Sequence, residues 1–161
     1  MLRRLAAAAL VLTALALTGC SQTVHVTPAE DANNPACAEV SVRLPDAIAG
    51  YNRSWTDAQS TGAWGNPSVA VLSCGVKVPG PTSTLQCSTI EGVDWLVDDS
   101  DERGVRVTTY GRDPAVQIFI DNHTVSSNEV LSNRGLVDAV KQISATRKCV
   151  SPDELPDDYV E

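Results

Sequence analysis

The sequence predicts an α+β domain in which a small antiparallel sheet of about four strands is flanked by N- and C-terminal helices and closed by two disulfides. Three observations lead to this fold class. Short runs rich in β-branched residues occupy the middle of the chain, apolar residues recur at helical spacing on either side of them, and four cysteines are distributed over residues 37–149. The domain is therefore expected to span residues 37–149.

The first helical segment is expected over residues 38–53. Its apolar residues recur at the spacing of one helical face: Val40, Leu44, Ile48 and Tyr51. Pro45 lies within this pattern, and proline interrupts a helix because it has no amide hydrogen to donate. Two short helical pieces are therefore predicted in place of one continuous helix.

The first two strands are predicted from composition and from the turns beside them. Residues 68–76 form a short apolar run between proline-containing turns, which favours a buried strand over a helix. Residues 84–90 and 93–97 are predicted as one further strand, and Glu91-Gly92 interrupts it with a bulge or bend.

The third and fourth strands are expected to form a hairpin. Residues 105–110 alternate between apolar and polar side chains, so one face should be buried and the other solvated. A turn follows, and residues 115–121 add a strand rich in Val, Ile and Phe. The acidic residues before this hairpin, 98–102, are interpreted as a charged turn, because Arg103 stands where a calcium loop needs a ligand.

The last element is a helix expected over residues 133–147. Its apolar residues recur at helical spacing: Leu136, Val137, Val140 and Ile143. Basic residues follow near its carboxyl end, where they complement the helix dipole. This helix is expected to cover one face of the sheet.

The N-terminus has the layout of a lipoprotein signal sequence. Two arginines precede a 13-residue apolar run over residues 5–17, and the run ends in Leu17-Thr18-Gly19-Cys20. A membrane-spanning helix needs about 20 apolar residues, so this run is too short for an uncleaved anchor. We expect residues 1–19 to be a signal peptide and Cys20 to carry a lipid. The protein would then lie on the outer face of the plasma membrane.

Lipidation of Cys20 accounts for the odd cysteine of the chain. Cys37, Cys74, Cys87 and Cys149 remain, and an even number in an oxidising compartment indicates two disulfides. Of the three pairings, Cys74 with Cys87 is favoured because they lie in strands joined by one Pro-Gly-Pro loop, which leaves Cys37 with Cys149. Zinc is the alternative, but the sequence has no Cys-x-x-Cys pair, so no metal or cofactor is expected.

The two ends of the mature chain are polar. Residues 20–36 are predicted to be a lipidated flexible tether, and residues 150–161 a disordered acidic tail. Residues 20–161 carry ten Lys and Arg against twenty Asp and Glu, a net charge of −10. Such a surface repels nucleic acid. The expected partners are the membrane, through Cys20, and an envelope protein or a wall glycan.

Candidate functional residues are few. A hydrolase would have to be built on His123, and the sequence has no nucleophile elbow such as Gly-x-Ser-x-Gly. Trp55, Trp64 and Trp95 are three of seven aromatic residues; each is expected to fill the core, and stacking on a sugar ring is the alternative. Arg112 either binds an anionic partner or has a structural role in its turn.

Four short motifs resemble one known family. They are Ala63-Trp64-Gly65-Asn66-Pro67, Cys74-Gly75-Val76, Val93-Asp94-Trp95-Leu96 and Thr109-Tyr110-Gly111-Arg112-Asp113-Pro114. Together they resemble the actinobacterial exported proteins grouped as domain of unknown function family 3515, over residues 37–149. The resemblance implies an exported single domain and brings no activity, substrate or cofactor with it. Motifs in turns indicate either a shared loop site or shared turn chemistry, and the candidate binding residues are Trp64, Trp95, Tyr110 and Arg112.

The leading hypothesis is a non-enzymatic binding or accessory module of the cell envelope, held at the membrane by its lipid. The alternative is an envelope hydrolase that uses His123 with nearby acids. A small-ligand carrier ranks third, because a domain of about 110 residues leaves little room for a deep pocket.

Overall fold

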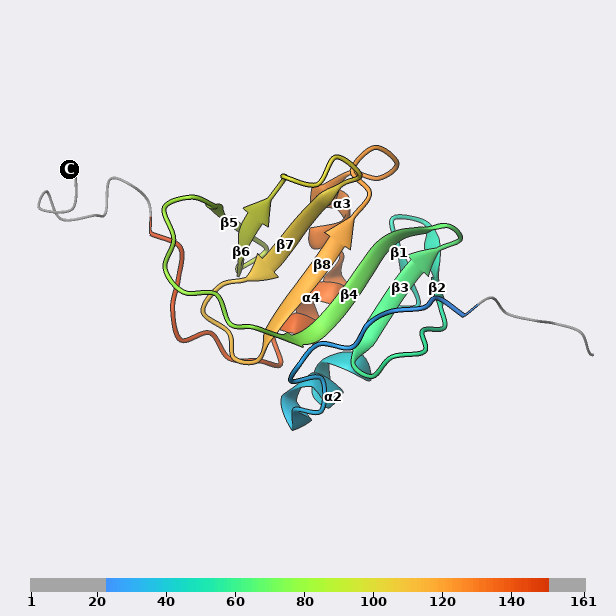
Figure 1. The fold of residues 1–161 in the computed structure, drawn as a ribbon, viewed down its shortest axis with the longest axis horizontal. Helices are drawn as coiled ribbons and strands as arrows, with labels where there is room; N and C mark the ends of the chain where they lie inside the picture. The colour runs from blue at the N-terminus through green and yellow to red at the C-terminus, as the bar shows by residue number, and fades with distance from the viewer. Residues whose placement is uncertain (1–22, 151–161) are drawn as a thin grey trace, which may run out of the picture.

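The computed structural model describes residues 23–150, which form one eight-stranded antiparallel sheet with short helices packed against it (Figure 1). The predicted signal peptide, Cys20 and the acidic residues 151–161 lie outside the described residues. The helices are α2 (Pro35–Ser41), α3 (Ser127–Leu131) and α4 (Arg134–Val140). The strands are β1 (Ala47–Ile48), β2 (Tyr51–Ser54), β3 (Thr61–Gly65), β4 (Ser68–Val76), β5 (Gln86–Ile90), β6 (Val93–Asp98), β7 (Val105–Thr109) and β8 (Ala115–Ile120).

The strand order is β1-β2-β3-β4-β8-β7-β6-β5, so two meanders meet where β4 pairs with β8. The predicted strand at residues 68–76 is confirmed as β4, and the predicted hairpin is confirmed as β7 and β8. The described sheet has twice the predicted number of strands, so the fold is mostly β. The helices form only a partial second layer.

Three of the four additional strands come from two segments that sequence patterns misassigned, and the fourth is β3, for which no element was predicted. Residues 47–53 were expected to be helical, but Ala49 and Gly50 have φ of 50° and 80°, and they turn the chain into the hairpin of β1 and β2. Glu91 and Gly92 have φ of 50° and 74°. Two consecutive residues with positive φ make a tight hairpin turn, so the predicted single strand is the hairpin of β5 and β6.

One face of the sheet packs on the helices and forms the core. Alternate residues of the central strands point to this face, and in β8 these are Val116, Ile118 and Ile120. Leu136 and Val140 of α4 belong to the same buried cluster. The predicted helix over 133–147 ends early, at Val140. After α4 the chain continues to the turn that follows β7, where the Thr146 backbone N–H donates to the carbonyl of Gly111 at 2.7 Å.

Residues 23–34, here called the N-terminal strap, cross the opposite face of the sheet. Val24 N–H donates to the Trp55 carbonyl at 2.7 Å, and Asp31 N–H donates to the Gly75 carbonyl at 3.0 Å. A Cβ on Gly75 would lie 2.3 Å from the Asp31 backbone, so the strap and β4 are in direct backbone contact. The strap corrects the predicted flexible tether over residues 20–36, because residues 23–36 are bonded to the domain.

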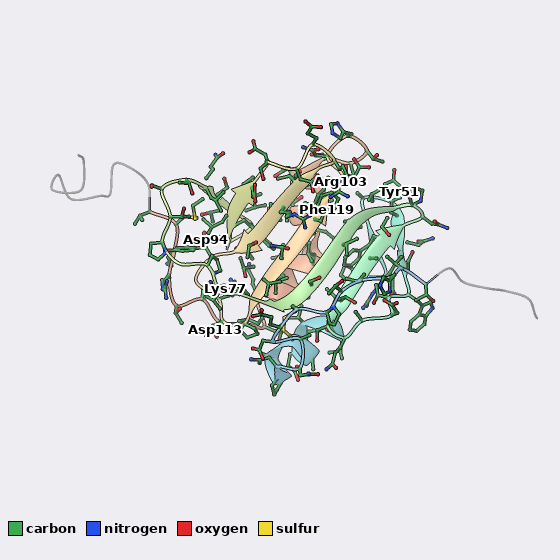
Figure 2. The ribbon with its side chains drawn as sticks, viewed as in Figure 1. Tyr51, Lys77, Asp94, Arg103, Asp113 and Phe119 are labelled. Atoms are coloured by element: carbon green, nitrogen blue, oxygen red, sulfur yellow. A yellow bond between two sulfur atoms is a disulfide. The ribbon has the colours of Figure 1, made fainter. Side chains whose placement is uncertain are left out.

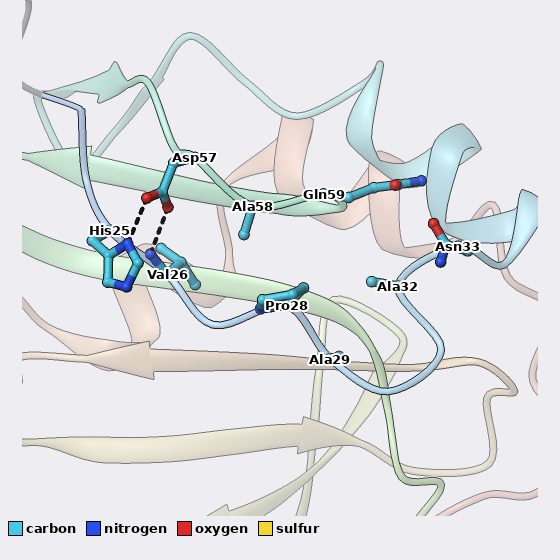
Figure 3. A pocket seen from close by; sticks show the side chains of 9 residues that line it. All are labelled: His25, Val26, Pro28, Ala29, Ala32, Asn33, Asp57, Ala58 and Gln59. Carbon is cyan, nitrogen blue, oxygen red and sulfur yellow. Dashed lines mark hydrogen bonds and ion pairs between the residues drawn. The ribbon is translucent and has the colours of Figure 1, made fainter.

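Two bonds to one carboxylate hold the outer end of the strap. His25 Nδ1 donates to Asp57 Oδ2, and Val26 N–H donates to Asp57 Oδ1 at 2.9 Å (Figure 3). Beside them lies a shallow pocket of about 340 Å³, lined by strap residues 25–33 and by residues 57–59. The hydrogen bond from His25, followed by that from Val26, holds the pKa of Asp57 below its usual range.

Acidification should therefore loosen the strap. Because the pKa of Asp57 is lowered in the fold, its contribution is complete above the unfolded value of about 3.9 and is lost as the pH falls through the folded pKa. We expect the hydrogen-exchange protection factor of the Val26 amide to be high at pH 6 and to fall at pH values below about 3. In an Asp57→Ala variant the protection factor of the Val26 amide should be low at both pH values. Equal protection of Val26 at pH 6 and at the acidic pH would contradict this account.

The two disulfides are Cys37–Cys74 and Cys87–Cys149, each with a Cα–Cα distance of 5.6 Å. Two disulfides were predicted, but the predicted pairing of Cys74 with Cys87 and of Cys37 with Cys149 is wrong. β4 and β5 are consecutive in the chain but four strand spacings apart in the sheet, about 19 Å. A disulfide requires Cα atoms within about 7 Å.

Candidate functional site

An apolar pocket lies on the strap side of the sheet, at the end formed by β5 and β6. Leu96 opposes Cys87 on one side and Thr108 on the other, so these three side chains share that face. Tyr110 follows β7 in the same alternation and adds its ring. These strand residues form the floor of the pocket. The residues next to them in sequence, such as Trp95, point to the opposite face of the sheet and into the core.

The walls of the pocket come from two segments that are distant in sequence. Pro81, Thr82 and Ser83 of the loop before β5 form one wall, and residues 148–150 form the other. The Cys87–Cys149 disulfide joins the second wall to the floor. This open pocket has a volume of about 450 Å³, within the range of small-ligand sites.

The turn after β7 holds the C-terminal wall in place. Both the backbone N–H and Oγ1 of Thr146 donate to the carbonyl of Gly111, at 2.7 and 3.0 Å. Gly111 has φ of 73°, and a Cβ there would lie 2.2 Å from the Arg147 carbonyl oxygen. The family motif at residues 109–114 therefore has a structural reason: only glycine allows the C-terminal segment to approach this turn so closely.

Arg112 has a structural position in this turn. The side chain is buried, with 5% of the residue exposed, and Nη1 donates to the Ile143 carbonyl. Burial lowers the pKa of its guanidinium, and the nearby Asp94 carboxylate partly opposes this shift. Asp94 also accepts from the Cys149 backbone N–H at 3.0 Å and from Thr89 Oγ1 at 2.6 Å. Figure 2 shows Asp94 at the β6 end of the sheet.

The structure does not bring the four predicted binding residues together in one site. Trp64 and Trp95 are buried, at 0% and 1% exposed, so the expectation that they fill the core is confirmed and neither ring can stack on a ligand. The same expectation is wrong for Trp55, which follows β2 and is 74% exposed. Arg112 holds the wall, and Tyr110 lines the pocket. Sequence reasoning missed Leu96, although its place next to the core residue Trp95 in a strand was a signal that it faces the other side.

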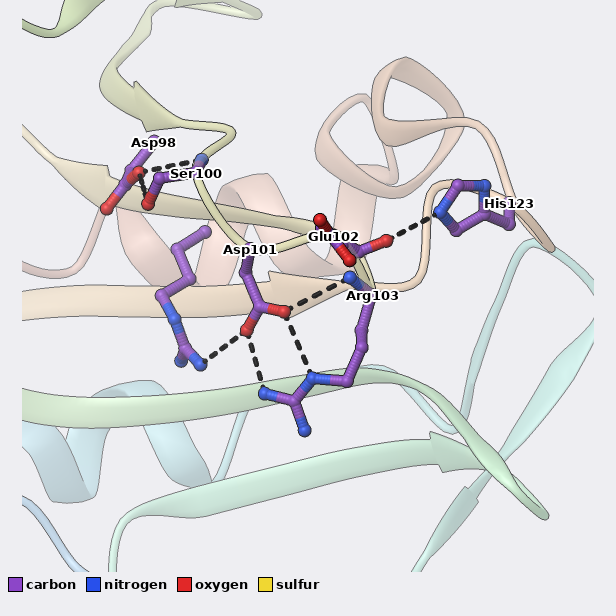
Figure 4. A network of polar contacts seen from close by, with 7 residues as sticks. Asp98, Ser100, Asp101, Glu102, Arg103 and His123 are labelled. Atoms are coloured by element: carbon purple, nitrogen blue, oxygen red, sulfur yellow. Dashed lines mark hydrogen bonds and ion pairs between the residues drawn. The ribbon is translucent and has the colours of Figure 1, made fainter.

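His123, the residue on which the hydrolase hypothesis depends, lies in the turn after β8. Its Nε2 donates to the carbonyl of Glu102 at 2.9 Å (Figure 4). Its backbone N–H donates to Asp121 Oδ1 at 3.1 Å. These two contacts tie the turn after β8 to the loop before β7. Within residues 23–150, no three His, Cys, Asp or Glu side chains are grouped to hold a metal ion.

The charged turn before β7 is an arginine cluster around one carboxylate. Arg103 Nη2 and Arg106 Nη2 lie 2.8 and 3.2 Å from Asp101 Oδ2 (Figure 4). These bonds, with that from Arg103 as the largest cause, hold the pKa of Asp101 far below its usual range. Both guanidinium groups also lie over the Phe119 ring, at 5.9 and 5.1 Å from its centroid, and Figure 2 shows Arg103 beside Phe119. The predicted interpretation as a charged turn agrees with these contacts.

The pocket is suited to an apolar group with a negative charge nearby. Its lining is mainly carbon and sulfur, from Leu96, Tyr110, Pro81 and the disulfide, with exposed Lys148 at the edge. A buried apolar group gains free energy from the area removed from water, and the lysine ammonium selects an acidic neighbour. The lining thus matches an apolar group that lies beside an anionic one.

Fold and pocket together define a small disulfide-closed β domain with a mainly apolar pocket at one end of its sheet. The chain belongs to the family described as a protein of unknown function (DUF3515), which matches residues 4–149. No curated protein and no solved structure matches the chain. The two disulfides indicate an oxidising, extracytoplasmic compartment. Among residues 23–150, every helix is too short or too polar to cross a bilayer.

Proposed function

We propose that this chain is a lipoprotein held on the outer face of the plasma membrane through Cys20, where its domain is a non-enzymatic binding or accessory module of the cell envelope. One observation carries the proposal. The four cysteines of residues 23–150 are closed into two disulfides, so Cys20 is the fifth and odd cysteine of the sequence. It follows the apolar run directly, in the context Leu17-Thr18-Gly19, as acylation requires.

The pocket beside Tyr110 supports recognition of an envelope protein over recognition of a wall glycan. A sugar site needs an exposed aromatic ring with polar groups around its hydroxyls, whereas this pocket is lined mainly by apolar atoms. An apolar anchor side chain that fills a concave site is the usual centre of a protein–protein contact. The partner we propose presents such a side chain next to an acidic residue.

A blocked-pocket variant tests the binding role. Ser83 is exposed and lines the pocket, so Ser83→Trp fills the opening without removing a core contact. Asn122→Trp, in the exposed turn after β8, is the matched control. After crosslinking in intact membranes, we expect a protein recovered with the wild type and with Asn122→Trp to be lost with Ser83→Trp. Identical recovery with all three proteins would contradict a pocket-mediated role.

A further inference from the structure

Trp55 is the exposed tryptophan of the chain, and it lies where the strap enters the domain. Of its residue surface 74% is exposed, whereas Trp64 and Trp95 are buried. Its carbonyl accepts from the Val24 backbone N–H at 2.7 Å, and Val24 pairs with Thr56 in a short parallel bridge. The position of Trp55 is thus fixed relative to the N-terminal end of the described chain.

Covalent geometry keeps this ring close to the proposed anchor. Val24 follows Cys20 by four steps along the chain, and an extended chain spans at most about 3.6 Å per step, or about 14 Å in total. Once the acyl chains on Cys20 enter a bilayer, Trp55 cannot move far from the lipid headgroups. A wall glycan lies further out, so the bilayer is the partner that this position favours.

The charges around Trp55 also suit a lipid surface. A cleft of about 240 Å³ beside the ring is lined by Asp46, Arg53 and Ser54, and Asp46 lies near the Arg53 guanidinium. On the strap side, His25 is bonded to Asp57. Asp46 and Asp57 thus each have a basic side chain beside them, although the chain as a whole has a net charge of −8. A charge-balanced patch meets zwitterionic headgroups without the repulsion that an acidic surface meets at an anionic membrane.

We propose that the Trp55 patch (Asp46, Arg53, Ser54 and Trp55) rests on the membrane, with the Trp55 ring in the headgroup region. Tryptophan favours this region because its ring is apolar and its N–H is polar. The inference rests on the proposed acylation of Cys20. In this orientation the β1–β2 end of the sheet faces the bilayer. The pocket beside Tyr110 lies at the opposite end of the sheet, by β5 and β6, which are five to six strand spacings or about 24 to 29 Å from β2 (Figure 1).

Quenching by brominated lipid chains tests this orientation. The native protein, with its acylation verified by intact mass, is reconstituted into phosphatidylcholine vesicles with and without brominated acyl chains. We expect brominated chains to reduce the tryptophan emission of the wild type and of Trp95→Phe, and to leave the emission of Trp55→Phe unchanged. Iodide in the water should quench the vesicle-bound wild type little more than the vesicle-bound Trp55→Phe variant, whose remaining tryptophans are buried.

Two results would overturn the inference. If an acylated protein shows no loss of emission with brominated chains and full quenching by iodide, the Trp55 patch faces water, and the lipoprotein assignment stands without it. A blue shift of that emission on adding an N-acetylglucosamine oligomer would then indicate a glycan site. If the protein carries no acyl group, the proposed function and this inference fail together.

Discussion

Replacing Cys37 and Cys74 together by alanine should lower the free energy of unfolding by about 4 kcal/mol, because a loop of 37 residues is no longer closed in the unfolded chain. A typical domain is stable by about 5 to 15 kcal/mol, so the loss is a large part of the total. Both cysteines are fully buried, and the bridge joins α2 to the central strand β4. Urea unfolding followed by circular dichroism measures the loss.

Mapping the bridges in the wild type provides the control for this prediction. Proteolysis without reduction should release one linked pair of peptides that contains Cys37 and Cys74, and a second that contains Cys87 and Cys149. Linked peptides with Cys74 and Cys87 would contradict the strand order, because these residues lie four strand spacings apart in the sheet. A double variant with unchanged stability would contradict the role of the bridge.

Replacing Trp64 by alanine should cost about 3 to 5 kcal/mol of stability. The ring is fully buried between Leu44 and the sheet, and its Nε1 donates to the Pro45 carbonyl at 3.0 Å. Removing it leaves a cavity and an unpaired carbonyl oxygen. The same change at the exposed Trp55 should stay within about 0.5 kcal/mol.

The paired comparison of Trp64→Ala and Trp55→Ala decides whether burial controls the effect. Both variants remove one tryptophan, so the difference in urea midpoint at equal slope reports the environment of the ring and not its chemistry. Equal losses at the two positions, or a larger loss at Trp55, would contradict the placement of Trp64 in the core and of Trp55 on the surface.

Sequence patterns within a few residues correctly predicted the strands whose apolar runs or alternating side chains match their burial in the sheet. Residues 68–76 are apolar between two turns, and they form β4 with the same bounds. Residues 105–110 alternate, and β7 buries every second residue. By contrast, the apolar spacing of Val40, Leu44, Ile48 and Tyr51 indicates one helix face, yet only Val40 lies in α2. The positive φ at Ala49 and Gly50 starts the β1–β2 hairpin, and Ala49 gives little sign of this in sequence.

The disulfides and the pocket depend on strand order, which local patterns do not contain. Counting cysteines predicts two bridges, but choosing their partners requires knowing that β8, β7 and β6 lie between β4 and β5. The pocket likewise joins Tyr110 to a loop about thirty residues before it and to Cys149 near the end of the described chain. Tyr110 was therefore found through its motif, and Leu96 was missed.

The central claim is that Cys20 is the one cysteine outside the two disulfides and carries the membrane anchor. Intact mass of the native protein, extracted with detergent, tests this claim most directly when it is measured before and after reduction and alkylation. We predict a mass of residues 20–161 plus acyl chains, with four thiols that appear only on reduction. An unacylated mass, or a thiol that alkylates before reduction, would contradict it.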